Sequence, residues 1–183
     1  MNNDKKCRTA LANWVAKYEW DVVGTLKIRD GFSENDALKE VRRYFNKVDR
    51  VFYGNKAYRK NVRVQRFVFL QRGAYGDNAH FHFVAKTPTN TNSAKEFCRL
   101  LKNIWERKIY ISSSKGRFVV AQNKAAISNY LTHEYELMGN DTIEVFTTHT
   151  NNKHYIGTQN GKKEQQALVR RAFKATTTKQ QRT

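Results

Sequence analysis

Two alternating segments joined by a glycine-containing turn constrain the fold of this chain most strongly. Every second side chain of residues 62–71 falls on one face of an extended strand: Val62, Val64, Arg66, Val68 and Leu70. A turn containing Gly73 and Gly76 follows, and residues 79–86 form a second run rich in apolar and aromatic side chains. This pattern predicts an antiparallel hairpin, and therefore a β-sheet at the centre of the fold.

Helices and further strands are expected on both sides of the hairpin. The 3.6-residue period predicts an N-terminal helix over residues 1–18, helices that begin after Ser33 and Ser93, and a helix over 123–138 that ends at Gly139. Strands are expected in four further segments: residues 20–28, 109–111, 117–121 and 142–148. The mixture predicts an α+β fold with a mostly antiparallel sheet of about five strands and flanking helices.

The length of 183 residues suits one compact domain, which we expect to span residues 1–150. From residue 151 the chain is polar, and a basic helix over 162–174 followed by a flexible tail is expected there. No apolar run approaches the roughly 18 residues of a membrane span, and the first residues lack the apolar stretch of a signal peptide. The expected location is the compartment of synthesis, which is the cytoplasm of a bacterial or archaeal host, or the nucleus of a eukaryotic one.

The charge balance indicates a polyanionic partner. Lys and Arg number 34 against 16 Asp and Glu, which gives a formal net charge of +18, and aromatic residues make up 13% of the chain. Cations follow phosphates and aromatic rings stack on unpaired bases, so this composition favours single-stranded nucleic acid. The basic segment 54–61 is either part of a binding edge or a solvated connector. Five basic residues are candidate phosphate contacts: Lys56, Arg59, Lys60, Arg63 and Lys115.

The second strand of the hairpin carries a histidine pair. His80 and His82 are separated by one residue, so both imidazoles project from the same face of the strand, while Phe81 and Phe83 are buried on the other. Two imidazoles so placed can share one metal ion. Gln71 ends the preceding strand, and across the hairpin its amide oxygen could face the same point, which makes it a candidate third ligand. The alternative is two exposed histidines and an ordinary polar strand end.

The expected helix over 123–138 carries a candidate nucleophile. Tyr130 and His133 are three residues apart and lie on one edge of that helix, whereas Ile127, Leu131 and Met138 face the sheet. A phenol has a pKa near 10, so its attack on phosphorus requires a nearby base or positive charge and a polarised phosphate. Without such a site, Tyr130 would be an ordinary half-buried aromatic residue.

The order of these features resembles the HUH endonuclease superfamily. A strand that ends in Gln71, a glycine turn, the strand with His80 and His82, and a helix with Tyr130 are most similar to rolling-circle replication initiators (Rep) with a single catalytic tyrosine. The resemblance covers roughly residues 20–148 and implies a ferredoxin- or RRM-like HUH nuclease domain.

By that resemblance, His80, His82 and Gln71 hold Mg²⁺ or Mn²⁺, and Tyr130 cuts single-stranded DNA of a replication origin or hairpin. The product is a 5′-phosphotyrosine and a free 3′-hydroxyl, and reversal rejoins the strand. No small-molecule cofactor is implied. The chain contains no G-x-x-x-x-G-K-[ST] motif, so a host helicase and polymerase are expected partners.

The chain departs from the family pattern at two positions. His133 stands where the family usually has lysine, and it could serve as a base, as a partial cation or in packing alone. Gln71 replaces a ligand that is often acidic, which weakens the expectation of tight Mg²⁺ binding. A transposase or relaxase of the same superfamily, a water-using metal-dependent hydrolase and a non-catalytic single-stranded nucleic-acid-binding module are the alternatives.

Overall fold

The computed structural model describes residues 3–73, 79–110, 112–113, 116–144 and 146–150. Its centre is a four-stranded antiparallel sheet of β1 (Val22–Lys27), β2 (Arg66–Gln71), β3 (His80–Ala85) and β4 (Arg117–Val120). The strands lie in the order β2-β3-β1-β4, so the β2–β3 hairpin predicted from the alternating pattern forms one half of the sheet. The predicted α+β class and the antiparallel sheet are confirmed.

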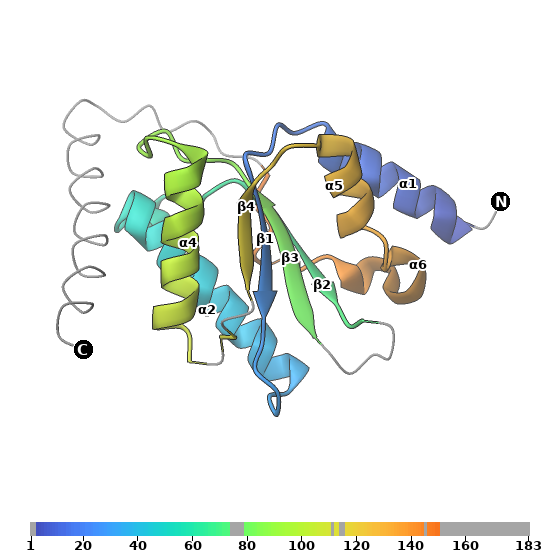
Figure 1. Ribbon diagram of the computed structural model, residues 1–183, viewed down its shortest axis with the longest axis horizontal. Helices are drawn as coiled ribbons and strands as arrows, with labels where there is room; N and C mark the ends of the chain where they lie inside the picture. The colour runs from blue at the N-terminus through green and yellow to red at the C-terminus, as the bar shows by residue number, and fades with distance from the viewer. Residues whose placement is uncertain (1–2, 74–78, 111, 114–115, 145, 151–183) are drawn as a thin grey trace.

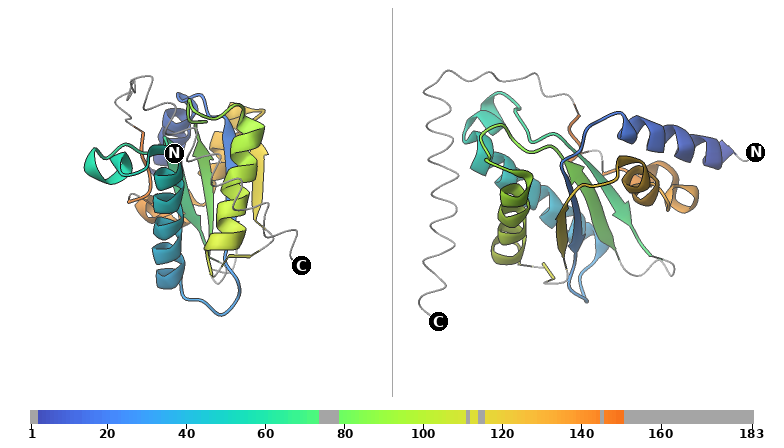
Figure 2. Two further views of the ribbon diagram at one scale, coloured as in Figure 1. Left: turned by 90° about the vertical axis from the view of Figure 1, so that its left-hand side faces the viewer. Right: turned by 45° about the horizontal axis from the view of Figure 1, so that its top comes forward.

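Helices cover both faces of the sheet (Figure 1). One face is covered by α2 (Glu34–Tyr53) and α4 (Ala94–Lys108), and α3 (Lys56–Arg59) lies beside α2. The other face is covered by α1 (Asn3–Ala16) and α5 (Lys124–Leu131), which contact each other, with α6 (Tyr135–Met138) beside α1. The two views of Figure 2 show the sheet between these two groups of helices. None of the helices in the described part of the chain has both the length and the apolar character of a membrane span.

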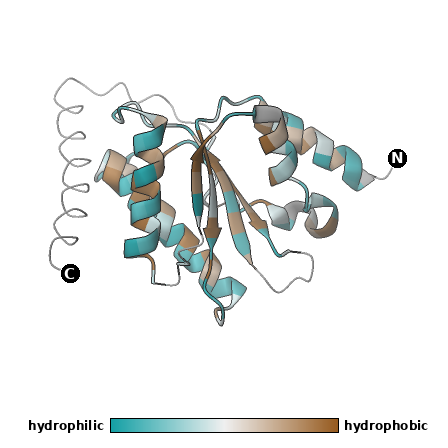
Figure 3. Ribbon diagram, viewed as in Figure 1, coloured by the Kyte–Doolittle hydropathy of each residue, from teal (hydrophilic) through white to brown (hydrophobic). Residues whose placement is uncertain are grey.

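The predicted helix starts after Ser33 and Ser93 are confirmed. The Ser33 hydroxyl accepts a hydrogen bond from the Asp36 amide, and the Ser93 hydroxyl accepts one from the Glu96 amide, so each serine satisfies an amide of the first turn of its helix. Both helices then present apolar side chains to the sheet and hydrophilic ones to solvent, and Figure 3 shows hydrophobic and hydrophilic residues mixed along the helices.

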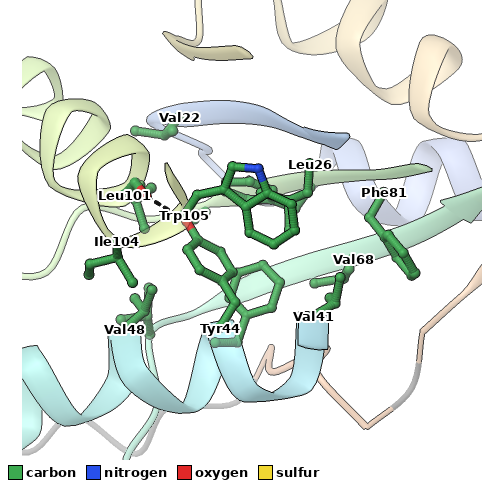
Figure 4. Packing of buried hydrophobic residues seen from close by; sticks show 14 of the residues in the cluster. Val22, Leu26, Val41, Tyr44, Val48, Val68, Phe81, Leu101, Ile104 and Trp105 are labelled. Carbon is green, nitrogen blue, oxygen red and sulfur yellow. Dashed lines mark hydrogen bonds between the residues drawn. The ribbon is translucent and has the colours of Figure 1, made fainter. Parts of the chain in front are cut away.

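The larger hydrophobic core lies between the sheet and helices α2 and α4 (Figure 4). Tyr44 of α2 packs edge-on against Trp105 of α4 at a ring separation of 5.3 Å, and its hydroxyl donates a hydrogen bond to the Leu101 carbonyl. Phe83 needs a glycine opposite it, because a Cβ on Gly24 would lie 2.1 Å from the Phe83 ring. This tight packing fixes the face of β3 that is turned away from His80 and His82.

A buried ion pair joins α2 to β2 within that core. Asp49 and Arg66 are 0% and 1% exposed, and the Arg66 guanidinium donates to both Asp49 carboxylate oxygens at 2.7 and 2.9 Å. Asp49 also accepts from the Val64 amide, and Arg66 Nε donates to the Thr147 carbonyl. Arg66 lies on the predicted apolar face of β2 and is fully buried there because each of its charged atoms is matched.

Two sequence-based expectations about elements are wrong. The segment 142–148 does not form a fifth strand in the described residues: beside β2 it has one isolated bridge, Phe69–Ile143, and one further backbone bond, from the Glu144 amide to the Val68 carbonyl. The Thr148 amide then donates to the Glu144 carbonyl in a turn that interrupts pairing. The helix expected over 123–138 breaks after Leu131. Thr132 directs its hydroxyl to the Ser128 carbonyl, a local bond that competes with helix continuation, and α6 begins only at Tyr135.

Smaller differences occur elsewhere. Ile109 and Tyr110 are not in a strand, and Ile111 lies outside the described residues. The segment 54–61, expected as a loop, contains the short helix α3. The helix and tail expected after residue 150 also lie outside the described residues.

The stability of the fold is expected to fall in mild acid because of His149. Its backbone pairs with that of Arg66 in both directions, and burial, followed by the nearby Arg66 charge, lowers the pKa of His149 to about 4. In the unfolded chain His149 takes up a proton as the pH falls below about 6.5, whereas in the folded chain it does so only near pH 4. The contribution of His149 to the free energy of unfolding is therefore fully present above pH 6.5 and is lost progressively as the pH falls toward 4. Between pH 7 and 5 we expect His149 to account for a loss on the order of 1 kcal/mol, which is less than the full pKa shift would give because solvent screens this partly buried ring.

Urea unfolding of the wild type and of His149→Gln at pH 7 and pH 5 measures this loss. The variant should lose about 1 kcal/mol less than the wild type over the same pH interval. Because all other ionisable groups are the same in both proteins, the difference between the two losses isolates His149. Equal losses would show that His149 does not carry this pH dependence.

Candidate active site

The two histidines of β3 lie on the sheet face that α5 covers. Pairing in register places His80 opposite Gln71 of β2 and His82 opposite Thr25 of β1. The rings of His80 and His82 are 5.0 Å apart between centroids, whereas Phe81 belongs to the core on the other face. The predicted same-face placement of the two imidazoles is therefore confirmed.

His82 is held by its neighbours in a neutral form. It is 2% exposed, and its Nδ1 lies 3.1 Å from the Thr25 hydroxyl. Burial lowers the pKa of His82 to about 3, and the nearby charges of His80, His133 and Lys27 act in the same direction. Its Nε2 atom is buried without a hydrogen-bond partner. With the proton on Nδ1, directed at Thr25, the Nε2 lone pair is available to a ligand.

Gln71 presents a second unsatisfied buried atom. Its side chain is 0% exposed, and Nε2 donates to the Leu131 carbonyl at 3.1 Å. That carbonyl can only accept, so it determines which end of the amide faces it and leaves Oε1 turned elsewhere. Oε1 is buried and has no partner. Burying an unsatisfied polar atom costs about 1–3 kcal/mol. The His82 and Gln71 atoms are two of seven such side-chain atoms in the described residues, and they form a candidate ligand site because they lie on the same sheet face.

Tyr130 lies directly over this pair. It is 53% exposed, near the end of α5, and its ring meets the His82 ring edge-on at 4.9 Å between centroids. Leu131, the next residue, is fully buried against β2 and β3 and anchors the helix end. The phenol is thus open to a large substrate while its helix is fixed to the sheet.

His133 stacks on Tyr130, as its spacing predicted. The two rings are nearly parallel, at 20°, with centroids 5.4 Å apart. Nδ1 of His133 contacts the Tyr130 carbonyl and also lies 3.3 Å from Gln71 Nε2. We assign the proton to Nδ1 because the carbonyl, which only accepts, is the closer of the two partners. The other ring nitrogen, Nε2, lies 3.6 Å from the Glu134 carboxylate. A proton gained at Nε2 would therefore be stabilised by an adjacent negative charge.

Glu134 is a site residue that sequence reasoning missed. It is 6% exposed, and its carboxylate accepts from the backbone amides of Arg72 and Gly73 at 2.8 and 3.2 Å. These amides directly follow Gln71, so Glu134 connects the end of β2 to the segment that carries Tyr130 and His133. A glutamate beside a histidine in a helical stretch gives no sequence signal of this long-range role.

The donor set available to a metal is small and contains no carboxylate among the described residues. The described residues contain no group of three or more His, Cys, Asp and Glu side chains that could hold an ion. His80, His82 and the Gln71 oxygen are the donors that the sheet brings together. Imidazole suits Mn²⁺ better than Mg²⁺, which prefers carboxylate and water, so the arrangement fits Mn²⁺ better.

The predicted phosphate contacts do not gather at this site. Lys56 and Arg59 lie in α3 and Lys60 follows it, beside α2 on the opposite face of the sheet. Arg63 donates to Asn46 and Asp49, and its position serves the core ion pair. Lys115 lies outside the described residues. Two cations of the described strands lie on the candidate site face: Lys27, opposite His80, and Arg117, opposite Thr25.

Comparison of the chain with models of protein families, with curated proteins and with solved structures gave no match. Conclusions about its activity therefore depend on the residues and their geometry.

Proposed function

We propose that this protein cuts and rejoins single-stranded DNA through a covalent bond to Tyr130, as rolling-circle replication initiators of the HUH superfamily do. One observation carries the proposal: an exposed phenol lies 4.9 Å, ring to ring, from a buried imidazole whose Nε2 has no partner, beside a buried amide oxygen that also has none. A nucleophile next to a cation-binding pair is what phosphoryl transfer needs.

The fold supports the same assignment. The order β1, α2, β2, β3, α4, β4, with both helices on one face and β1 and β3 in the middle of the sheet, is that of a ferredoxin-like domain. We propose that this is the ferredoxin- or RRM-like nuclease domain expected from the resemblance. Helix α5, which carries the tyrosine, lies beside α1 on the sheet face opposite α2 and α4.

His80, His82 and Gln71 would hold the divalent ion. When bound, the ion supplies positive charge that polarises the scissile phosphate. His82 contributes a neutral nitrogen because its burial opposes protonation, and Thr25 fixes its ring. Gln71 is oriented by the Leu131 carbonyl of the same helix that carries Tyr130, so the ligand and the nucleophile are positioned by one contact.

In the proposed step, Tyr130 Oη loses its proton and bonds to phosphorus. The bond from phosphorus to the 3′-oxygen breaks, and that oxygen takes a proton, which gives a 5′-phosphotyrosine and a free 3′-hydroxyl. His133 is the proposed proton acceptor: its Nε2 carries the lone pair, and Glu134 stabilises the resulting cation. Attack by a 3′-hydroxyl on the phosphotyrosine reverses the step and rejoins the strand.

A transposase or relaxase of the same superfamily would use the same chemistry on other DNA. In each case the expected partners are a single-stranded origin or hairpin and host proteins that unwind and copy it. The non-catalytic binding module is the alternative of a different class, and it explains the net charge but leaves the two unsatisfied buried atoms without a purpose.

Metal removal tests the proposal. The protein is incubated with a random-sequence single-stranded 40-mer that is labelled at either the 3′ or the 5′ end. With Mn²⁺, we expect a protein band that carries the 3′ label through SDS and does not carry the 5′ label. EDTA should abolish this band and added Mn²⁺ should restore it. His82→Ala should lose the band, whereas His149→Gln, altered far from the site residues, should keep it.

Three other outcomes would contradict the proposal. Cutting without protein-linked DNA would indicate a hydrolase that uses water. A salt-sensitive gel shift without cutting would indicate a binding module. An adduct that forms equally in EDTA would show that the histidine pair holds no required ion.

A further inference from the structure

A groove opens between β4 and α5, next to Tyr130. Its volume is about 500 Å³, within the range of roughly 300–1,000 Å³ that is typical of small-ligand sites. Strands β1 and β4 form its floor, and the start of α5 and the segment before it form one wall. Its lining residues are Val23, Thr25, Arg117, Val119, Val120, Ala121, Gln122, Asn123, Ala126, Ile127 and Tyr130.

The groove is continuous with the candidate active site. Pairing in register sets Arg117 opposite Thr25, and Thr25 opposite His82, so these three residues share one face of the sheet. Thr25 lines the groove and also contacts His82 Nδ1 at 3.1 Å. Tyr130 lines the groove and contacts the His82 ring. A molecule in the groove would therefore adjoin the phosphate that Tyr130 attacks.

The lining has the chemistry of a nucleotide site. Val23 and Val119 provide an apolar floor, and Ile127 an apolar wall, against which a flat base can lie. Two amides lie at the rim: Gln122, and Asn123, whose Oδ1 accepts from the Ala126 amide, so that its Nδ2 is directed away from the helix. Amides of this kind hydrogen-bond to base edges.

Arg117 supplies the positive charge at the groove. Its side chain is exposed, the lining contains no acidic residue, and no carboxylate of the described residues forms an ion pair with it. By contrast, Arg63 and Arg66, two other arginines near the sheet, are committed to Asp49. An uncommitted guanidinium beside an apolar slot is suited to the phosphate of a bound nucleotide.

We propose that the groove between β4 and α5 binds the nucleotide next to the cleaved phosphate, with the base against Val23, Val119 and Ile127 and a flanking phosphate on Arg117. This proposal rests on the proposed function for its place beside a cleaved strand. The groove would then contribute sequence preference at one position, through the amides of Gln122 and Asn123.

Binding measurements in EDTA test the groove separately from catalysis. The probes are labelled dT20 and a 20-mer of abasic deoxyribose phosphate, which has the same backbone charge but no bases. Ala126 is exposed at the groove wall, so Ala126→Trp fills the groove and leaves the hydrophobic core unaltered. It should weaken dT20 binding about tenfold, as expected for loss of a stacked base, and leave the abasic polymer unaffected. Ala10→Trp, at an exposed alanine of α1, is the matched control and should bind both probes normally.

Arg117→Ala should weaken binding of both probes and make the slope of log K against log salt shallower by about 0.7, the value for one phosphate contact on a single strand. Lys102→Ala, an exposed cation of α4 that pairs with Glu106, should leave that slope unchanged. The groove proposal would be overturned if Ala126→Trp bound dT20 as tightly as the wild type does. It would also be overturned if the slope of log K against log salt were the same for Arg117→Ala as for the wild type. Because no cutting is expected in EDTA, these results are independent of adduct formation. The groove proposal can be wrong while Tyr130 still forms an adduct, and it can be right while no adduct forms.

Discussion

Replacing Tyr130 with phenylalanine is expected to abolish the SDS-stable protein–DNA adduct. The substitution removes only the phenolic oxygen, the atom that would bond to phosphorus, and keeps the ring that meets His82 edge-on and stacks on His133. At 53% exposure, the hydroxyl has no buried partner to lose, so the fold should be unaffected. Binding of single-stranded DNA in EDTA should remain close to that of the wild type, which separates loss of the nucleophile from loss of the binding surface.

Two other tyrosines provide controls for this experiment. Tyr110 is 74% exposed and is absent from the candidate site, so Tyr110→Phe should leave adduct formation unchanged. Tyr135 begins α6 and packs against the smaller core, so it is not expected to replace Tyr130 as nucleophile. An adduct that persists at wild-type yield in Tyr130→Phe would refute the assignment of the nucleophile.

Replacing Asp49 with alanine is expected to lower the free energy of unfolding by about 3–5 kcal/mol. The substitution leaves the Arg66 guanidinium, 1% exposed, with an uncompensated charge in the core. It also removes the acceptor of the Val64 amide and a partner of Arg63. Because α2 and β2 are joined through this carboxylate, the loss should appear as a lower urea midpoint of the whole domain.

An exposed ion pair provides the contrast for that measurement. Lys102 and Glu106 of α4 are 3.8 Å apart with side chains 53% and 30% exposed, so Glu106→Ala should cost only about 0.3–0.5 kcal/mol. A loss for Asp49→Ala as small as that for Glu106→Ala would mean that the buried pair does not anchor α2 to the sheet.

The parts of the fold that follow a strict sequence period were predicted correctly. The period of two in residues 62–71 and 79–86 placed the hairpin and put His80 and His82 on one face. Serine caps marked the starts of α2 and α4. Two features were not predictable in this way: segment 142–148 forms no strand in its described residues, and the helix breaks after Leu131. Both depend on local side-chain and turn bonds that compete with regular pairing.

The candidate site residues were named from the sequence, but the residues that position them were not. His82, Gln71 and Tyr130 are recognisable by residue type and order, and the structure brings them together. Glu134 and the role of Thr25 depend on contacts between distant segments that no local pattern encodes.

The basic residues chosen from segment 54–61 do not lie at the candidate site. The sequence could not single out Arg117, because among 34 Lys and Arg residues only its tertiary position distinguishes it. Sequence alone therefore indicates which residue types could form a site, and the sheet register gives their arrangement.

Peptide mapping of the DNA-linked protein tests the central claim most directly. After reaction with Mn²⁺, nuclease trimming and trypsin digestion, the modified peptide should run from Ala125 to Lys153, because no Lys or Arg lies between them. Fragmentation of this peptide should place the nucleotide mass on Tyr130. A nucleotide on Tyr135, on a peptide from another part of the chain, or on no peptide at all would contradict the account of a helix-borne phenol acting beside a histidine pair.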